Sequence, residues 1–294
     1  MNTRTHCICS APLIRKPFSP NFDALGCNEC GSSHFVSTEN GLPPPEFKYD
    51  SDNGKYAQDD YLFGKQLRWA HHELLKQNWI GRKVLEIGCF NGFFLDELRN
   101  AGADVYGFDV NENAISVGKE MFGFGDRLND SMEILAKQGP FDDVLCIDVL
   151  EHLDWPENSL DEIIAMLRPN GRVIVAGPTI ERGFRDKSDY PPHHKWWFSR
   201  SGLELCLQLK GFGISSVAIQ HDGLLFLRNF LGKALHGLDK KEFYGETKVE
   251  APQFNSPTSS FLYAMAAKVG ISLFTILRIS YCSTILIGTK GTSK

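Results

Sequence analysis

The sequence predicts an α/β fold in which a mostly parallel sheet is covered by helices on both faces. Two observations indicate it. Short apolar segments of strand length alternate with segments of helical periodicity between about residues 80 and 220. Glycine or proline–glycine turns mark several of the expected boundaries. The 294 residues, 42% hydrophobic and 23% charged, are enough to bury one such core and a small appendage.

The elements are expected in a fixed order along the chain. A leading helix is predicted within 56–79, where apolar residues recur at helical spacing. Strands are predicted at 83–87, 104–108, 143–147 and 172–176, with helices at 93–100, 113–121 and 160–167, the last stopped by Pro169-Asn170-Gly171. These elements are followed by a helix at 201–209 and a strand at 214–219. After them come two apolar helical segments, at about 224–235 and 261–279, and a last strand at 283–287.

Changes in composition divide the chain into four parts. Residues 1–45 form a cysteine-rich module, and Pro43-Pro44-Pro45 is a stiff linker at its end. Residues 46–80 form the leading helical segment, 81–220 the α/β core, and 221–294 a helical insertion followed by the last strand.

The net charge and the hydropathy of the chain limit the kinds of partner and the cellular location that we expect for it. The formal net charge of -5 and the pI near 6.0 argue against a large nucleic-acid interface. The first ten residues lack the apolar run of a secretory signal, and Lys268 and Arg278 interrupt the most lipophilic stretch, 261–287. We therefore expect a cytoplasmic protein, with peripheral membrane contact through the C-terminal helices as an alternative. The oligomeric state is not indicated.

The most informative segment, Val84 to Leu95, runs from a strand through a glycine loop into a helix. Glycines let the backbone approach a ligand closely, and the helix start offers unpaired N–H groups. A dinucleotide site would show Gly-x-Gly-x-x-Gly, whereas Gly88 and Gly92 are spaced Gly-x-x-x-Gly and follow the acidic Glu86. The spacing favours a cofactor without a pyrophosphate. Asp109 closes the next strand, where a carboxylate can accept both ribose hydroxyls.

Together with the segments Phe141–Leu153 and Leu167–Val175, this pattern resembles class I S-adenosylmethionine-dependent methyltransferases over residues 56–219. The resemblance implies a Rossmann-like sheet that binds S-adenosyl-L-methionine. It implies that Glu86, Gly88 and Gly92 line the methionine end of the cofactor and that Asp109 takes the ribose. It also adds Asp148 to the cofactor set and places Asp130 near the adenine, with Asn129 as the competing choice. The alternative is a Rossmann-like domain that has lost cofactor binding.

Methyl transfer to a hydroxyl acceptor requires its orientation and the removal of its proton. The best candidate bases are His193 and His194, in the loop 190–199 that follows the strand 172–176. Such a loop belongs at the carboxyl edge of the sheet, where ligands bind. The alternative is a loop folded by Trp196 and Trp197 packing on the core, in which the histidines are only hydrogen-bonded.

Asp148-x-x-Glu151-His152 supports a second interpretation. It resembles the acidic–Glu–His set with which some methyltransferases of ubiquinone synthesis and small-RNA ends hold a divalent cation. By that analogy these residues and His193 or His194 would bind Mg²⁺. Because Glu-His also occurs at this place in methyltransferases without metal, we favour a structural pair at the strand end.

The eight cysteines fall into two groups. Cys27-x-x-Cys30 is a zinc-knuckle pattern, and Cys7-x-Cys9, or His6-x-x-Cys9, is a less regular partner. We predict one structural zinc ion held by Cys7, Cys9, Cys27 and Cys30. A similar module precedes the methyltransferase domain in a group of sugar C-methyltransferases. The remaining four, at 89, 146, 206 and 282, are interpreted as small core side chains.

These observations predict a methyltransferase for a small-molecule acceptor such as a sugar, a glycan or a lipid-linked intermediate. One alternative is a metal-assisted O-methyltransferase of RNA ends or of a quinone precursor. A non-catalytic, cofactor-binding scaffold is the alternative from another class.

Overall fold

The computed structural model describes residues 4–38, 67–180, 189–222 and 281–291. The chain divides into two compact units. The first comprises Met1–Ile180, Lys187–Ile219 and Ser283–Lys294, and it contains every site discussed below. The second, Glu181–Asp186 and Gln220–Cys282, lies almost entirely outside the described residues. So do most of the expected leading helix and both apolar C-terminal helices. Among the described residues, no helix has the length and apolar character needed to cross a membrane.

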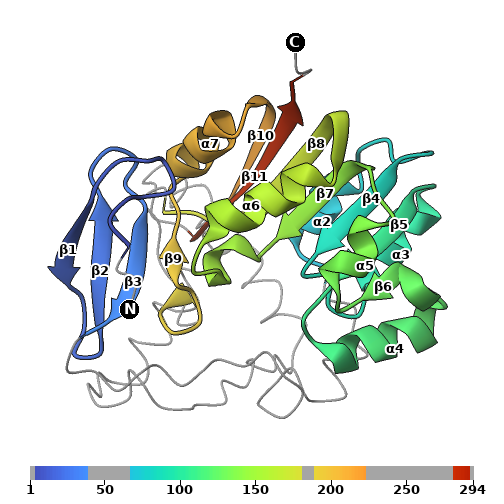
Figure 1. The fold of residues 1–294 in the computed structure, drawn as a ribbon, viewed down its shortest axis with the longest axis horizontal. Helices are drawn as coiled ribbons and strands as arrows, with labels where there is room; N and C mark the ends of the chain where they lie inside the picture. Colours follow the sequence, from blue (N-terminus) through green and yellow to red (C-terminus); the bar gives the residue numbers. More distant parts are fainter. Residues whose placement is uncertain (1–3, 39–66, 181–188, 223–280, 292–294) are drawn as a thin grey trace, which may run out of the picture. The chain divides into compact units, whose positions relative to one another are not determined.

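Within the described residues, a seven-stranded sheet forms the centre of the first unit (Figure 1), in the order β10-β11-β8-β7-β4-β5-β6. Strands β4 to β8 run parallel, and β11 is antiparallel to β8. The strands are β4 Lys83–Ile87, β5 Asp104–Phe108, β6 Leu128–Asn129, β7 Phe141–Ile147, β8 Leu167–Pro178, β10 Phe212–Asp222 and β11 Tyr281–Lys290. The predicted α/β class is therefore confirmed.

Helices cover both faces of this sheet, as predicted. Adjacent strand residues, such as Val84 and Leu85, point into two separate hydrophobic clusters. One cluster joins the sheet to α5, α6 and α7, and the other joins it to α2, α3 and α4. The helices are α2 Trp69–Leu74, α3 Phe93–Asn100, α4 Glu112–Phe122, α5 Met132–Ala136, α6 Pro156–Ala165 and α7 Arg200–Leu209, with short 3-10 turns at Gly125–Arg127 and Leu150–His152. The cysteines at 89, 146 and 206 are buried, as expected.

The predictions for β4, α3 and β5 are confirmed residue for residue, but the prediction for α6 was wrong at both ends. The helix begins at Pro156, because proline suits the first helical position, where its missing N–H leaves no hydrogen bond unmade. It ends before Leu167, which pairs with Phe141 of β7. The expected stop, Pro169-Asn170-Gly171, therefore lies inside β8, next to an irregularity in its pairing with β7.

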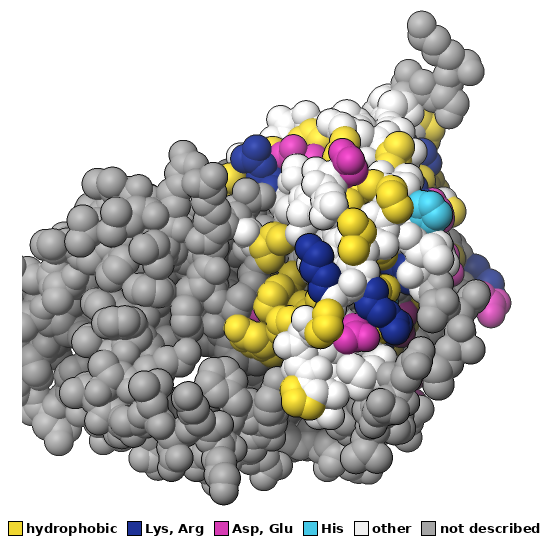
Figure 2. All heavy atoms as spheres, turned by 90° about the vertical axis from the view of Figure 1, so that its left-hand side faces the viewer, with side chains coloured by type: hydrophobic (Ala, Val, Ile, Leu, Met, Phe, Trp, Pro, Cys, Tyr) yellow, Lys and Arg dark blue, Asp and Glu magenta, His cyan; other side chains and the backbone are white. Residues whose placement is uncertain are grey.

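The N-terminal module is a small antiparallel sheet. Its strands are β1 Leu13–Pro17, β2 Phe22–Cys27 and β3 Ser33–Ser37, and the sheet gains a fourth strand, β9 Trp196–Trp197, from the loop after β8. Figure 2 faces the side of the molecule on which Figure 1 draws this module. Hydrophobic, basic and acidic side chains are interspersed there.

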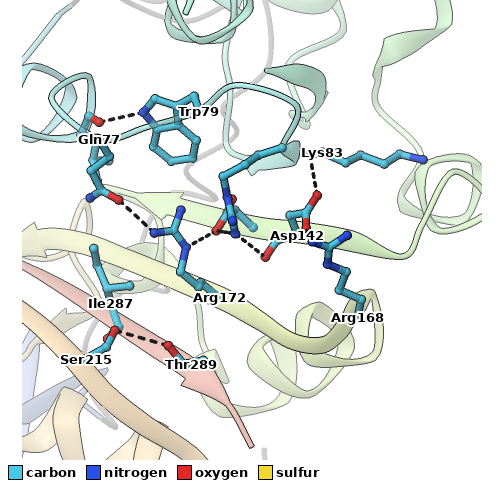
Figure 3. Close-up of polar contacts among 12 residues, drawn as sticks. Gln77, Trp79, Lys83, Asp142, Arg168, Arg172, Ser215, Ile287 and Thr289 are labelled. Carbon is cyan, nitrogen blue, oxygen red and sulfur yellow. Dashed lines mark hydrogen bonds and ion pairs between the residues drawn. The ribbon is translucent and has the colours of Figure 1, made fainter. Parts of the chain in front are cut away.

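A buried charge network lies at the amino ends of the parallel strands (Figure 3). Asp143 of β7 is fully buried and forms ion pairs with Arg82 and Arg172. The neighbouring Asp142 pairs with Arg168 and accepts the backbone N–H of Lys83 at 2.8 Å. The network joins β4, β7 and β8 at the end of the sheet away from the glycine loop.

Candidate functional site

The glycine loop lies at the carboxyl end of β4, where the backbone turns into α3. Gly88 has φ +75° and Gly92 has φ +74°, both in the left-handed region that glycine tolerates best. A Cβ on Gly88 would come within 2.4 Å of the Val149 side chain, and one on Gly92 within 3.1 Å of Phe124. Both positions therefore require glycine, which leaves the loop backbone open to a ligand.

Glu86 precedes this loop as a buried carboxylate, 3% exposed. Its Oε2 atom has no hydrogen-bond partner in the described structure. Burial, together with the charge of Asp109, raises the pKa of Glu86 to about 8. A carboxylate kept away from water in this way needs a cationic or hydrogen-bond-donating partner, so it suits the ammonium group of a methionine moiety.

Asp109 follows β5 and lies beside the same loop. Its Oδ2 atom accepts the backbone N–H of Phe90 at 2.7 Å, and its Oδ1 accepts that of Asn111 at 2.8 Å. Burial raises its pKa, while these backbone hydrogen bonds oppose the rise. The bonds fix the carboxylate at the carboxyl edge of the sheet, and each oxygen keeps a further lone pair for a ligand hydroxyl.

Asn129 and Asp130 are the two residues that the sequence offers for the adenine position. Asn129 ends β6; it is buried, and its side-chain oxygen accepts the backbone N–H of Ser131 at 3.0 Å. Asp130 is exposed. Asn129 ends and Asp130 follows β6, the strand next to β5, so both stand at the edge of the sheet where Asp109 lies.

Asp148 stands at the end of β7 with φ +53°, an uncommon conformation for a residue other than glycine. Its backbone N–H bonds to Ala176, and its carboxylate pairs with Arg68 at 2.6 Å. Arg68 caps α2 and was not predicted, because the leading segment carried no motif that pointed to the site.

Glu151, His152 and His194 form a second cluster at this edge. Each offers one potential ligand atom, and these atoms lie within 4.8 Å of one another. The rings of His152 and His194 meet edge to face with centroids 4.7 Å apart, and the Glu151 carboxylate lies against Gly177. The loop that carries His194 thus reaches the Glu151–His152 segment, and Asp148 is not part of the cluster.

The surroundings of this cluster set the protonation and orientation of its side chains. His152 Nδ1 lies 2.7 Å from the backbone oxygen of His193, and a ring that donates there presents Nε2 as its ligand atom. Burial lowers the pKa of His152 and so favours its neutral form, which ligates metals. Burial and the nearby Asp148 raise the pKa of Glu151, whose Oε1 has no hydrogen-bond partner in the described structure.

The structure separates the two predicted catalytic histidines. His194 is buried, 9% exposed, with its Nδ1 atom 3.5 Å from the carboxylate of Asp189. His193 is exposed and contributes its backbone oxygen to His152. His71 and His72 lie on α2, where His71 packs against Phe93 and Phe94.

The four N-terminal cysteines also converge. Their sulfur atoms lie within 4.8 Å of one another, at 3.6 Å for the pair Cys7 and Cys30 and at 3.6 Å for Cys9 and Cys27. Tetrahedral zinc with Zn–S bonds of about 2.3 Å places its sulfurs about 3.8 Å apart. The exposed His6, whose Nδ1 atom bonds to Thr5, is not part of the group. The spacing of the sulfurs therefore fits a zinc ion.

Comparison with known proteins matches the methyltransferase domain family to residues 59–217, more than half of the chain. The ubiquinone biosynthesis O-methyltransferase of Aromatoleum aromaticum is 31% identical over 172 residues, which are 53% of this chain and 66% of that protein. The mitochondrial ubiquinone biosynthesis O-methyltransferase of Schizosaccharomyces pombe is 34% identical over 109 residues, which are 35% of this chain and 39% of that protein. The matched residues therefore span 66% of the length of the first curated relative and 39% of the length of the second.

Among solved structures, phosphoethanolamine N-methyltransferase 2 of Haemonchus contortus, in complex with S-adenosyl-L-methionine, aligns with a TM-score of 0.51. The alignment covers 95% of this chain and 71% of that protein at 15% identity. At this identity the likeness concerns the fold alone, and it agrees with the Rossmann-like sheet described above.

Proposed function

The chain belongs to the methyltransferase domain family, and we propose that it uses S-adenosylmethionine to methylate a hydroxyl group of a small molecule. One observation carries the choice of a hydroxyl: Glu151 and His152, which follow β7 beside the glycine-loop strand β4, converge with His194 from the loop after β8. Two imidazoles and a carboxylate are a donor set that holds a divalent cation and leaves positions open for an acceptor.

The residues of the glycine loop fit the cofactor. When bound, S-adenosylmethionine supplies a methyl group on a sulfonium, which an acceptor oxygen displaces. Glu86 offers an unpartnered carboxylate oxygen to the ammonium of the methionine moiety. Gly88 and Gly92 keep the backbone accessible, and Asp109 holds its carboxylate ready for the ribose hydroxyls.

The second cluster fits a divalent cation such as Mg²⁺ or Mn²⁺. A cation held by Glu151, His152 and His194 would lower the pKa of a hydroxyl bound to it. The backbone oxygen of His193 orients His152, and the absence of a side chain at Gly177 leaves room for the Glu151 carboxylate. These residues would thereby hold the acceptor oxygen in place and favour its deprotonation.

The acceptor class follows from the same chemistry. A cation with open positions binds best to a hydroxyl that has a second oxygen next to it. The relatives named for ubiquinone biosynthesis support a catechol-like quinone precursor as the first acceptor to test. Other acceptor classes also carry neighbouring oxygens, namely sugars, glycans, lipid-linked intermediates and RNA ends. As acceptors, these classes remain predictions from the sequence.

The proposal is tested with metal-stripped protein, an aromatic vicinal diol and S-adenosylmethionine. We expect turnover with added Mg²⁺ or Mn²⁺ and at least tenfold less without them, because the acceptor then keeps its proton. Direct Mn²⁺ binding, followed by electron paramagnetic resonance, should weaken in Glu151→Gln and persist in Glu133→Gln, an exposed carboxylate on α5. Equal turnover in the presence of a chelator, with unaltered Mn²⁺ binding by Glu151→Gln, would contradict it.

We also propose that the N-terminal cluster holds a structural zinc ion. Elemental analysis of the purified protein is expected to find about one zinc per chain, since four thiolates complete a tetrahedral site. Replacement of both Cys27 and Cys30 by serine should remove it. Cys206→Ser is the matched control, because this buried cysteine lies outside the cluster. Zinc retained in the double variant would show that the ligands are misassigned.

Cofactor binding has its own test at Asp109. Asp109→Ala is expected to weaken the binding of S-adenosylhomocysteine by about 2 kcal/mol, because charge-assisted hydrogen bonds to the ribose are lost. Isothermal titration calorimetry measures this difference, and Asp126→Ala, at an exposed carboxylate, serves as the control. A folded wild-type protein that binds neither S-adenosylmethionine nor its product would refute the cofactor assignment.

A further inference from the structure

We infer that the four-cysteine module acts as a template for the loop that carries His194, so that zinc in the module keeps the acceptor site assembled. The inference rests on the proposed function where it concerns turnover, but its structural part stands on contacts between the module and the loop. We call residues 189–199 the histidine loop. It lies between the module on one side and Glu151 with His152 on the other.

The first contact is a strand pairing. Strand β9 of the histidine loop extends the small sheet by pairing with β3, in the register His34 to Trp196 and Ser33 to Trp197. The pairing continues beyond the strand, where the backbone N–H of Phe35 donates to the oxygen of Lys195 at 2.8 Å. The residue that follows His194 is therefore bonded directly to the module.

The second contact is a buried hydroxyl pair at the zinc knuckle. Ser32, fully buried, follows Cys30 and accepts the backbone N–H of Ser199 at 3.0 Å. Ser199 caps α7, and Ser201 in the same turn donates its hydroxyl to the backbone oxygen of Cys30 at 3.2 Å. The far end of the histidine loop is thus fixed to the Cys27–Cys30 turn.

Aromatic packing fills the space between these two contacts. Trp197 packs against Phe18 and Phe35 of the module with ring centroids 5.4 and 4.7 Å apart. Trp196 lies against the guanidinium of Arg4, which stands 4.5 Å above its ring and 4.6 Å from that of Trp155. Both tryptophans of β9 are therefore held from the module side.

The other side of the histidine loop contacts the candidate site. The backbone N–H of Lys195 donates to the oxygen of Glu151 at 2.8 Å, and the oxygen of His193 lies 2.7 Å from Nδ1 of His152. Lys195 is therefore bonded to the module through its oxygen and to the site through its N–H. A shift of β9 would move His194 away from Glu151, and shifts of about 1 Å can lower turnover about 100-fold.

Zinc matters to this arrangement because the module has little core of its own. Strand β1 is mostly exposed, and the described part of the module, residues 4–38, is shorter than chains that usually fold without a metal or disulfides. Zinc bound by four thiolates supplies folding free energy directly. Without zinc, we expect the module to loosen and the histidine loop to lose its pairing strand, while the glycine loop in the large sheet stays folded.

Hydrogen exchange of the full chain, with and without zinc, tests the structural part without any acceptor. After removal of zinc by a chelator, amides of 194–198 should exchange at least tenfold faster, and those of 83–95 should stay within about twofold. Re-addition of Zn²⁺ should restore the slow exchange. Unchanged exchange in 194–198 would overturn the inference. Equal acceleration in both segments would also overturn it, because the module would then support the whole fold.

Ser32→Ala tests the same link without removing the metal. It deletes the hydroxyl that accepts the backbone N–H of Ser199. Thr38→Ala is the control, since the Thr38 hydroxyl donates to the backbone oxygen of Pro20 within the module. With zinc bound, Ser32→Ala should lower kcat about tenfold or more and speed exchange in 194–198, with the KM for S-adenosylmethionine unchanged. A Ser32→Ala protein with wild-type exchange and kcat would overturn the inference.

The two failures are distinguishable. If no diol is methylated, the proposed function fails, yet the exchange measurements still decide whether zinc orders the histidine loop. If a diol is methylated and hydrogen exchange in 194–198 is the same with and without zinc, the proposed function stands and the template role is wrong.

Discussion

Replacing His194 by alanine is expected to lower turnover by about 10²–10⁴-fold and to leave the affinity for S-adenosylmethionine within about twofold of the wild-type value. The imidazole lies with Glu151 and His152, whereas Glu86, Gly88 and Asp109 belong to other strand ends. The loss should therefore appear in the chemical step. Single-turnover rates with a vicinal diol and calorimetry of cofactor binding measure the two quantities separately.

His193→Ala is the matched comparison. The exposed neighbour contributes a backbone oxygen to His152, and alanine keeps that oxygen, so a smaller loss is expected. If His194→Ala also abolishes the response to added Mg²⁺ or Mn²⁺, the imidazole is a metal ligand; a metal-independent loss assigns it as general base. Full activity in the double variant, His193→Ala with His194→Ala, would leave the loop with a structural role only.

Replacing Asp143 by alanine is expected to lower the free energy of unfolding by about 3 kcal/mol. The carboxylate is fully buried and neutralises both Arg82 and Arg172, so its loss leaves two cationic groups side by side. The effect lies at the lower end of the usual range because the two arginine side chains are 27% and 22% exposed, so water partly solvates their charges. Urea denaturation monitored by circular dichroism would measure the change.

Asp104→Ala provides the contrast. Asp104 pairs with Arg127 at the surface, and the side chains are 44% and 46% exposed, so its replacement should cost no more than about 1 kcal/mol. A loss below 1 kcal/mol for Asp143→Ala, equal to that of Asp104→Ala, would show that the buried network contributes little to stability.

The parts of the fold that the sequence predicted best are those defined by local pattern. Strands β4 and β5 and helix α3 were predicted residue for residue, because each apolar run ends at a glycine or a carboxylate that also ends the element. Helix α6 was placed wrongly because Pro169-Asn170-Gly171 favours a helix stop locally, while pairing with β7 draws the same residues into β8. Tertiary pairing decided that boundary.

The small sheet could not be predicted in the same way. Strand β1 alternates poorly, since four of its five residues are exposed, and β9 is only two residues long. Strand β9 exists because β3, far away in the sequence, offers it a partner. Nothing in Trp196-Trp197 alone indicates that pairing, so the sequence predicted a loop at 190–199, and its strand was missed.

The candidate site was predictable where chemistry and strand ends coincide. Glu86, Asp109 and Asp148 each end or follow a parallel strand, which brings them to one edge. The choice between His193 and His194 needed the structure, because adjacent residues in a loop point differently. Arg68 could not be found, since no motif in the leading segment marks it as the partner of Asp148.

Strand β11 has a consequence for the order in which the protein folds. It lies between β8 and β10, although roughly sixty residues separate it from β10 along the chain. Within the described part of the molecule, β10 reaches the sheet only through β11. Closing so long a segment costs chain entropy before any pairing offsets it. The nucleus should therefore be the parallel half, β4 to β8, and the antiparallel edge should join it last, when the C-terminal strand docks.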